Sequence, residues 1–269
     1  MMRKRRKVTA KNMIEVLDYH TSKTYKRNGK RIKKINPTPE VMQKQNEKNA
    51  EAMLRMIIDN NFNTNDLYLT LTYEKQPDWE QAKKDIQNFI RRLKRRYKRE
   101  GRELKYIYVA EGKTRIHFHM ILNNAIDLYS DELNELWQYG MHKIVLYQGR
   151  AEDAVRLASY FVKEKRACYY EKNETFKRRW MASKNLKKPE IKVETLKAST
   201  WRDTITAPKG YYVETDSIVD SVSAEGYPYR FYRLIRIEEG KKHANSIRNH
   251  RPINDRWING NASNCTMRS

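Results

Sequence analysis

Two histidines separated by one phenylalanine lie inside an apolar run at residues 116–122: His117, Phe118 and His119. Side chains of a β-strand alternate between its two faces, so both imidazoles point the same way while Phe118 packs on the other side. Such a pair can supply two nitrogen ligands to one metal ion. Because a bound divalent ion polarises a phosphate oxygen, the pair indicates metal-assisted phosphate chemistry. The alternative is two ordinary histidines on a half-exposed strand.

Glu111 is the candidate third ligand, because it ends the strand pattern just before the histidines. A hairpin loop of odd length would place it on the same face as both imidazoles. An even loop, such as a turn at 112–115 followed by a strand from residue 116, would place it on the opposite face unless a bulge shifts the register. Two imidazoles and one carboxylate suit Mg²⁺ or Mn²⁺. Zinc is the competing metal, but nothing here supplies the cysteines of a structural zinc site.

A candidate nucleophile follows about forty residues later, where Tyr160 and Lys163 lie one helical turn apart. Tyr160 falls nearly opposite the apolar side of its helix, which is formed by Ala154, Val155, Ala158, Phe161 and Val162. Its phenol could attack phosphorus and give a covalent 5′-phosphotyrosine with a free 3′-hydroxyl. A phenol pKa near 10 makes activation necessary, and Lys163 could stabilise the phenolate or the transition state. The alternative is an ordinary exposed tyrosine.

The charge balance points to a polyanionic partner. The 269 residues include 56 Lys+Arg against 33 Asp+Glu, a formal net charge of +23. Such an excess attracts nucleic acid. No apolar run is long enough to span a membrane, and none follows the basic start as a signal peptide would require. Two cysteines without close spacing fit a reducing compartment. We therefore expect a cytoplasmic location and no membrane partner.

The hydrophobic periodicity predicts an α+β fold. Strands are expected at 67–73, 105–111, 116–122 and 142–147, and helices at 39–61, 79–99, 130–137 and 151–166. From residue 67 the order is β-α-β-β-α-β with an added helix, which is typical of a ferredoxin-like or RRM-like antiparallel sheet with a split βαβ unit. Helices on one face would leave the other face of the sheet open. That open face is where we expect the histidines to act.

Three segments are expected along the chain. Residues 1–37 are basic and poorly periodic, which predicts a flexible arm that lies along a phosphate backbone. Residues 38–190 hold the motifs and are expected to form the catalytic domain. Residues 191–269 form a C-terminal extension, with a β-hairpin built from strands at 211–215 and 229–237 and a mobile tail.

Further residues are candidates for contacts with DNA. The last turns of the helix at 79–99 carry more cations than the negative end of a helix dipole requires, which favours a phosphate-contacting face. Aromatic side chains on the first strand could stack bases. The predicted DNA-binding residues are Tyr68, Thr70, Thr72, Tyr73, Arg91, Arg92, Lys94, Arg95, Arg96 and Arg115.

At these residues the chain resembles the HUH (His-hydrophobe-His) endonucleases, specifically the single-tyrosine rolling-circle replication initiators. Three motifs match in order: residues 69–73 (LTLTY), 117–122 (HFHMIL) and 160–163 (YFVK). Glu111 stands in the position of the family's extra acidic ligand, and 183–189 is also similar. The resemblance covers roughly residues 45 to 190. The tyrosine follows the histidines, whereas in conjugative relaxases it precedes them. We expect no helicase module of the kind that viral relatives often append, and the C-terminal third is unassigned.

The resemblance implies an enzyme that nicks and rejoins single-stranded DNA at a replication origin. It implies a divalent metal, Mg²⁺ or Mn²⁺, and no nucleotide cofactor, because transesterification conserves the bond energy. A host helicase and the host replication machinery are the implied partners. Two alternatives remain. One is a single-tyrosine transposase of the same superfamily; the other is a non-catalytic protein that binds single-stranded nucleic acid on an RRM-like sheet, for which Tyr106 and Tyr108 are a partial aromatic match.

Overall fold

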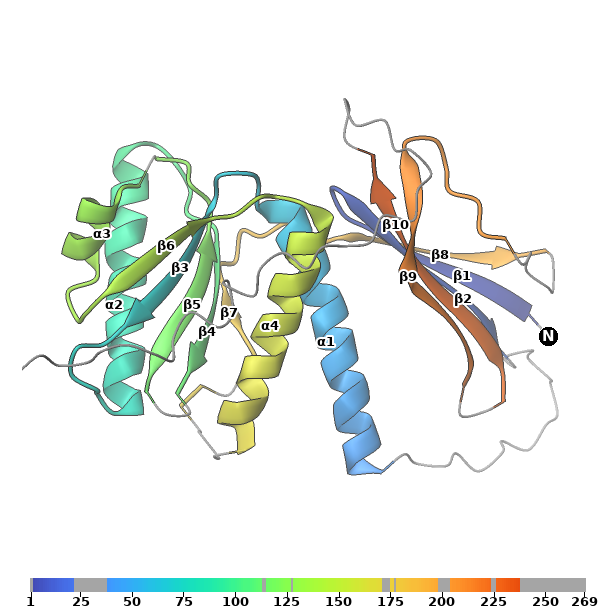
Figure 1. Ribbon diagram of the computed structural model, residues 1–269, viewed down its shortest axis with the longest axis horizontal. Coiled ribbons are helices and arrows are strands. Elements are labelled where there is room, and N and C mark those ends of the chain that lie inside the picture. Colours follow the sequence, from blue (N-terminus) through green and yellow to red (C-terminus); the bar gives the residue numbers. More distant parts are fainter. Residues whose placement is uncertain are drawn as a thin grey trace, which may run out of the picture. The chain divides into compact units, whose positions relative to one another are not determined.

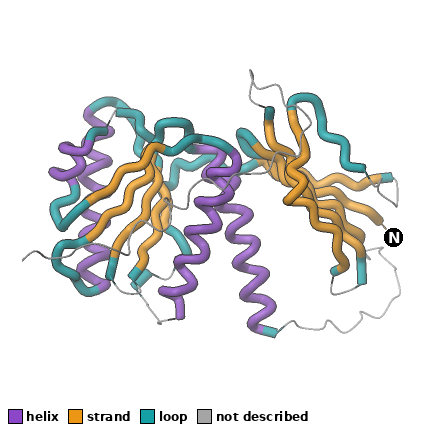
Figure 2. Tube along the Cα trace, in the orientation of Figure 1, coloured by secondary structure: helices purple, strands orange, loops and turns teal. Residues whose placement is uncertain are grey.

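The computed structural model describes residues 2–21, 38–112, 115–126, 128–170, 175–176, 178–197, 204–223 and 226–237. These residues form four α-helices and two five-stranded antiparallel sheets (Figures 1 and 2). In the described part of the chain, no helix is long and apolar enough to cross a membrane. The predicted mobile tail lies outside the described residues.

The central sheet contains the strands that carry the motifs, in the order β6-β3-β5-β4-β7. Strand β5 lies between β3 and β4 and runs antiparallel to both. The four strands predicted for this part are confirmed, each within one residue of its expected bounds. The strands are β3 (Leu67–Thr72), β4 (Tyr106–Glu111), β5 (His117–Leu122), β6 (His142–Leu146) and the short β7 (Met181–Ala182).

One face of the central sheet is covered by α2 (Trp79–Arg99) and α3 (Ser130–Leu136). Helix α2 begins where the Asp78 carboxylate accepts a hydrogen bond from the Gln81 backbone N–H at 2.7 Å. Its apolar stripe then recurs every three or four residues and packs under the sheet. The fully buried side chains of this core include Leu69, Leu71, Ile86, Phe89, Leu93, Phe118 and Met120.

The other face is not open, and that expectation is wrong. Helix α4 (Ala151–Tyr170) packs against it, and α1 (Pro39–Asn61) packs against α4, as Figure 1 shows. The reason lies in the strands themselves, because β4 and β5 are almost continuously apolar and are buried on both faces. This second core includes Leu54, Ile58, Ile107, Val109, Ile121, Ala158 and Phe161.

The second sheet has the order β8-β1-β2-β10-β9 and joins the two ends of the described chain. The flexible arm is wrong for residues 2–21, because they form β1 and β2. The cations of β1 are held by a neighbouring acid: Arg3 and Arg5 each donate to the Asp18 carboxylate at 2.7 Å. Residues 22–37 of the expected arm lie outside the described residues. The strands are β1 (Met2–Thr9), β2 (Met13–Thr21), β8 (Glu190–Leu196), β9 (Tyr211–Val222) and β10 (Pro228–Arg236).

The predicted C-terminal hairpin is confirmed, since β9 and β10 pair antiparallel. It does not stand apart as an extension, because β10 also pairs with β2 near the start of the chain. Strand β9 is longer than expected, running to Val222 through an irregular register around Phe231 and Arg233. Strands near both ends of the chain therefore form one sheet.

A buried ionic cluster connects this sheet to α1 and leads to a stability prediction. Glu15 is 5% exposed and is shared by Arg55 and by Arg233, whose Nε lies 3.5 Å away. Replacing Glu15 by alanine leaves two guanidinium groups without their common carboxylate. We expect the free energy of unfolding to fall by about 3–5 kcal/mol, measured by urea denaturation.

The matched control is Glu194→Ala. It removes a pair with Lys7 in which the two side chains are 50% and 42% exposed. A solvent-exposed pair contributes less than about 1 kcal/mol, so this variant should unfold close to the wild-type midpoint. Equal losses in both variants would contradict a structural role for the buried cluster.

Candidate metal centre

The register of the β4–β5 hairpin decides where Glu111 points. Glu111 pairs directly with His117, and Val109 pairs with His119. Directly paired residues share a face, so Glu111 and both histidines lie on the side covered by α4. The loop spans residues 112–116, an odd number, because β5 begins at His117 rather than at residue 116. The backbone N–H of Ile116 instead donates to Gln76 Oε1 at 2.6 Å.

The close approach of the Trp79 ring explains why a glycine follows Glu111. A Cβ on Gly112 would lie 2.4 Å from the ring of Trp79 at the start of α2. Only glycine fits there without a shift of that ring. The local sequence therefore sets both the direction of Glu111 and the path of the chain that leaves it.

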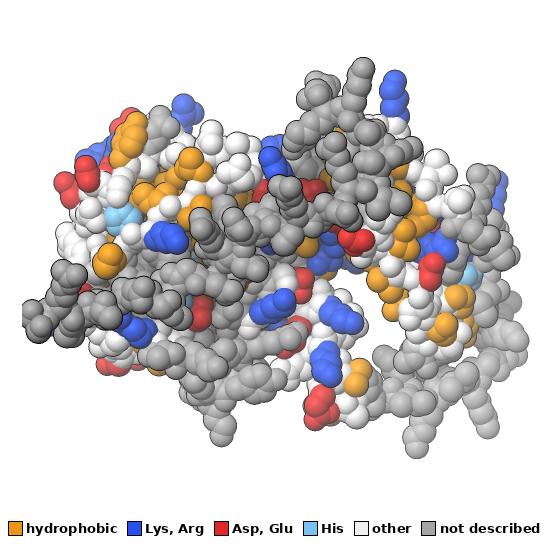
Figure 3. Space-filling model, viewed as in Figure 1, with side chains coloured by type: hydrophobic (Ala, Val, Ile, Leu, Met, Phe, Trp, Pro, Cys, Tyr) orange, Lys and Arg blue, Asp and Glu red, His pale blue; other side chains and the backbone are white. Residues whose placement is uncertain are grey.

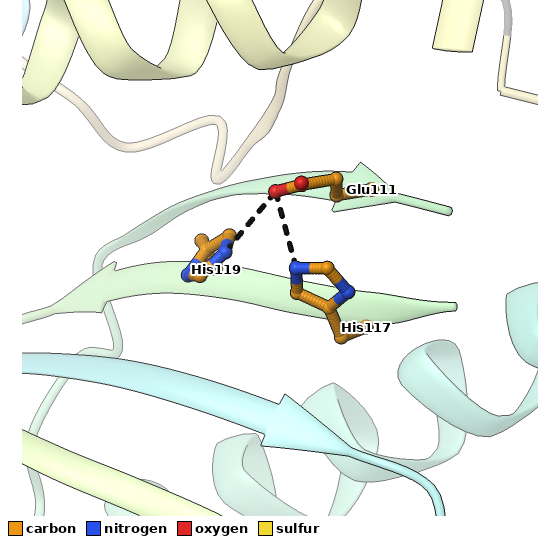
Figure 4. A group of neighbouring side chains, drawn as sticks. All are labelled: Glu111, His117 and His119. Atoms are coloured by element: carbon orange, nitrogen blue, oxygen red, sulfur yellow. Dashed lines mark ion pairs between the residues drawn. The ribbon is translucent and has the colours of Figure 1, made fainter. Parts of the chain in front are cut away.

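The three side chains converge on one point (Figure 4). Glu111 Oε2 lies 3.1 Å from His117 Nε2 and 3.3 Å from His119 Nε2. One ligand atom from each residue lies within 4.8 Å of the other two, a grouping that could hold a metal ion. His119 is 7% exposed, whereas Glu111 and His117 are half-buried. The expected triad is thus assembled from the ends of two adjacent strands.

The hydrogen bond of His117 defines which of its nitrogens is available. His117 Nδ1 lies 2.9 Å from the backbone carbonyl oxygen of Arg115. A carbonyl oxygen can only accept, so the neutral ring carries its proton on Nδ1 and keeps the lone pair of Nε2 directed at Glu111. This is the tautomer that a metal-binding histidine requires.

His119 is oriented by side chains from β3. Its Nδ1 lies 2.9 Å from the Tyr68 hydroxyl and 3.2 Å from the Thr70 hydroxyl, and its ring stacks on Tyr68 with centroids 5.9 Å apart. Burial lowers the pKa of His119, because the charged ring would lose hydration. The ring is therefore neutral near pH 7. A proton on Nδ1 can be donated to either hydroxyl group, and that tautomer leaves the Nε2 lone pair for a cation.

The structure shows Tyr68 and Thr70 in contact with His119, which the sequence did not predict. Both were predicted to contact DNA, but they lie behind His119, because Thr70 pairs directly with it. The strict alternation of β3 was the available signal, since it puts these residues on one face. The register between β3 and β5 cannot be read from either strand alone, so the contact was missed.

Removal of the Tyr68 hydroxyl should weaken metal binding. Tyr68→Phe keeps the stacked ring and deletes the contact with His119 Nδ1. We expect the affinity for Mn²⁺ to fall about tenfold, measured by isothermal titration calorimetry. Tyr139→Phe is the control, because Tyr139 is also half-buried but packs against the core under α2. Unchanged affinity in Tyr68→Phe would show that the hydroxyl does not orient the ligand.

Tyr160 reaches the same point from α4. Its hydroxyl lies 2.7 Å from His119 Nε2 and 3.3 Å from Glu111 Oε2. Its ring is half-buried beside Phe161 and packs against the edge of the second core. Helix α4 covers the ligand-bearing face of the sheet, and Tyr160 lies at the border of the buried surface. Lys163, one turn further along, is exposed.

One predicted DNA contact is a core residue. Tyr73 is 4% exposed, and its ring packs against Phe118 and Trp137 with centroids 6.3 and 5.2 Å apart. Burial raises its pKa far above the usual value for a phenol. No base can stack on this ring, so its predicted role in binding DNA is wrong. The alternation of β3 continues through Tyr73, which follows Leu69 and Leu71 on the buried face.

Two predicted contacts lie beside His117. Thr72 pairs directly with it, and the Thr72 hydroxyl donates to the Met141 carbonyl at 3.0 Å. Arg115 is exposed and donates to the Tyr73 carbonyl at 2.9 Å. A further cation was not foreseen: Lys143 on β6 is exposed and pairs with Thr70, which puts it on the ligand-bearing face. Lysines on edge strands are common, so no sequence signal singled it out.

The cations of α2 lie on the far side of the sheet from the metal ligands. Arg92 donates to the Leu136 carbonyl at 3.0 Å, and Arg96 pairs with Glu132 and Glu100. These two side chains hold α3 and the end of α2. Arg91, Lys94 and Arg95 are exposed. Their contact with DNA stays a prediction, and the structure does not bring them to the ligands.

Comparison with known proteins links this site to replication. Residues 66–165 match the model of a family of replication-associated proteins, the ORF2 type. The matched range contains Glu111, His117, His119, Tyr160 and Lys163, and it leaves the second sheet outside. No curated protein and no solved structure gives a significant match to this chain.

Proposed function

We propose that this protein initiates rolling-circle replication as a single-tyrosine HUH endonuclease, nicking and rejoining single-stranded origin DNA through a covalent tyrosine intermediate. The observation that carries the proposal is the 2.7 Å between the Tyr160 hydroxyl and His119 Nε2, which joins the nucleophile to the candidate metal ligands. The family match of residues 66–165 supports the replication role. The order β6-β3-β5-β4 supports a ferredoxin-like split βαβ arrangement.

The residues present fit a hard divalent cation. The Nε2 atoms of His117 and His119 both approach Glu111 Oε2, so three possible ligand atoms meet at one point. Acceptors that face one another repel unless a cation lies between them. Two imidazole nitrogens and one carboxylate oxygen suit Mg²⁺ or Mn²⁺. When bound, such an ion polarises the scissile phosphate and orients it.

The chain's own groups then carry out the transesterification. The Tyr160 oxygen attacks phosphorus, the bond from phosphorus to the 3′-oxygen breaks, and the 3′-oxygen leaves with a proton. The 5′-phosphate stays on Tyr160. The phenol proton is the one that leaves with the 3′-oxygen, and Lys163 would stabilise the developing negative charge. Attack by a 3′-hydroxyl on the phosphotyrosine reverses the step, so no nucleotide cofactor is required.

The remaining features complete the proposal. The net charge of +23 favours a DNA partner, and Arg115, Thr72 and Lys143 flank the ligands as candidate contacts to the strand. We propose that it acts in the cytoplasm of a bacterial host, where strand separation is supplied by a host helicase and copying by the host replication machinery.

The test uses labelled single-stranded oligonucleotides tiled across both strands of the replicon that carries the gene. Full-length protein is incubated with them and Mn²⁺. A detergent-resistant adduct on one oligonucleotide, lost on chelation and mapped by mass spectrometry to the peptide containing Tyr160, supports the proposal. Tight binding without any adduct would instead favour the non-catalytic binding protein.

A further inference from the structure

The cations of β1 on one face of the second sheet form ion pairs, and those on the other face form none with the described residues. On one face, Arg3 and Arg5 pair with Asp18, and Lys7 lies 3.2 Å from Glu194. Lys4 and Arg6 alternate with these residues and therefore lie on the opposite face. Neither forms an ion pair with any residue that the structure describes. Three of the five cations on β1 are thus paired with acidic side chains of the described residues, and Lys4 and Arg6 are not.

Strand pairing places aromatic side chains beside these two cations. Lys4 pairs with Tyr19, which pairs with Tyr229; Arg6 pairs with Leu17, which pairs with Phe231. Directly paired residues share a face. Two rows therefore cross all five strands, and we call them the aromatic face: Thr195, Lys4, Tyr19, Tyr229 and Ser221, then Val193, Arg6, Leu17, Phe231 and Val219.

The aromatic face is accessible and has no acidic side chain in either row. All ten residues are half-buried or exposed. Val193 and Val219 of these rows, and Ile191 next to them, are 44–55% exposed. Figure 3 shows hydrophobic side chains at the surface on the right of the view, with basic and acidic side chains among them. An apolar, cationic surface without acids is complementary to a polyanion that carries flat rings.

Neighbouring surfaces of the same sheet are covered. On the opposite face, Val16, Tyr232 and Leu234 pack against Ile205 and Ala207. At one end of the same face, other residues join the core beneath α1 and α4, namely Val8, Met13 and Ile235. Leu17, Tyr19, Tyr229 and Phe231 belong to none of the hydrophobic clusters formed by the described residues.

We propose that the aromatic face binds single-stranded DNA. Bases stack on Tyr19, Tyr229 and Phe231, and the phosphates contact Lys4 and Arg6. A duplex keeps its bases stacked on one another and offers no ring to this flat surface. An apolar protein segment would leave both cations without anions. The inference rests on the proposed function for DNA as the substrate, and gives the second sheet the task of holding strand that flanks the nick.

The charge test measures binding without cleavage. Full-length protein is titrated into fluorescein-labelled dT30 in EDTA, and anisotropy is followed over a range of salt concentrations. The double variant Lys4→Gln/Arg6→Gln is expected to bind at least about tenfold more weakly, with the slope of log affinity against log salt reduced by about 1.4. The control Lys7→Gln/Lys192→Gln removes the same charge from the other face, where both side chains are partly exposed. It should stay within about twofold of wild type.

The ring test separates stacking from charge. Phe231→Leu and Tyr229→Leu keep an apolar side chain and remove the flat ring, so each should weaken binding of dT30 by about fivefold or more. Binding of a duplex of the same length should change less than that of the single strand. Tyr211→Leu is the control, because Tyr211 packs in the cluster on the other face. Urea unfolding midpoints identify any variant that has lost its fold.

Three results would overturn the inference. They are equal weakening by both double variants, equal loss of duplex and single-strand binding in the ring variants, and unchanged binding in all of them. Failure of the proposed function is a separate result, namely wild-type protein that forms no adduct. Chelator and a homopolymer remove that chemistry from the binding measurement.

Discussion

Tyr160→Phe is expected to abolish the covalent protein–DNA adduct and to slow nicking about a thousandfold or more. The substitution removes the oxygen that bonds phosphorus in the proposed mechanism and leaves the ring beside Phe161 in place. The measurement is a single-turnover assay with labelled single strand and Mn²⁺, scored for cleavage and for detergent-resistant adduct.

The same variant should bind Mn²⁺ at least as tightly as wild type. In the structure the Tyr160 hydroxyl lies 2.7 Å from His119 Nε2, the lone pair that a metal would use. Deleting the hydroxyl removes that competitor, so lost activity would not follow from a lost metal. Tyr139→Phe is the control for a tyrosine elsewhere in the fold. An adduct that persists in Tyr160→Phe would show that another residue is the nucleophile and would contradict the proposed role of Tyr160.

His119→Ala should lose both metal binding and nicking. His119 is the most buried of the three candidate ligands, and two hydroxyl groups hold its ring in place. Without its Nε2, two ligands remain. We expect the affinity for Mn²⁺ to fall at least about a hundredfold, beyond the loss caused by an orienting residue alone. Calorimetry with Mn²⁺ and the nicking assay both report the change.

His142→Ala is the matched control, because it removes a half-buried imidazole from another strand of the same sheet. His142 lies on β6, pairs with Leu71, and places Nε2 3.0 Å from the Ser130 hydroxyl on the side of α3. Burial lowers its pKa as it does for His119, yet it faces the other core. Comparable metal loss in both variants would show that the paired histidines of β5 are not the ligands.

Local pattern was enough to locate the strands and the ligand pair. Alternation put His117 and His119 on one face, and residues of β3 alternate in the same way. Glu111 needed one further fact, the length of the hairpin loop. That length depends on whether Ile116 joins β5, and a hydrogen bond to Gln76 decides it. A contact forty residues distant in sequence cannot be read from the hairpin itself.

The errors arose where a partner lies far away in sequence. Residues 2–21 looked like an arm because a cation-rich segment lacks a local hydrophobic period. They are strands because Asp18 neutralises Arg3 and Arg5 and because β10 supplies the next strand. Tyr73 was assigned to DNA although the alternation of β3 puts it on the buried face with Leu71, where its ring packs against Trp137. Because β4 and β5 are almost continuously apolar, the sequence did indicate a sheet that is covered on both faces.

The joining of β2 to β10 has a consequence for the order of events during synthesis. Residues 67–182 contain every strand of the central sheet, so that sheet can be complete while the ribosome is still adding later residues. Strands β1 and β2 emerge first but gain the neighbour β10 last. Until then the nascent chain presents an unpaired β2 edge, a template for association with other chains. A product truncated before residue 228 would retain that edge permanently, which makes premature termination a direct route to aggregation.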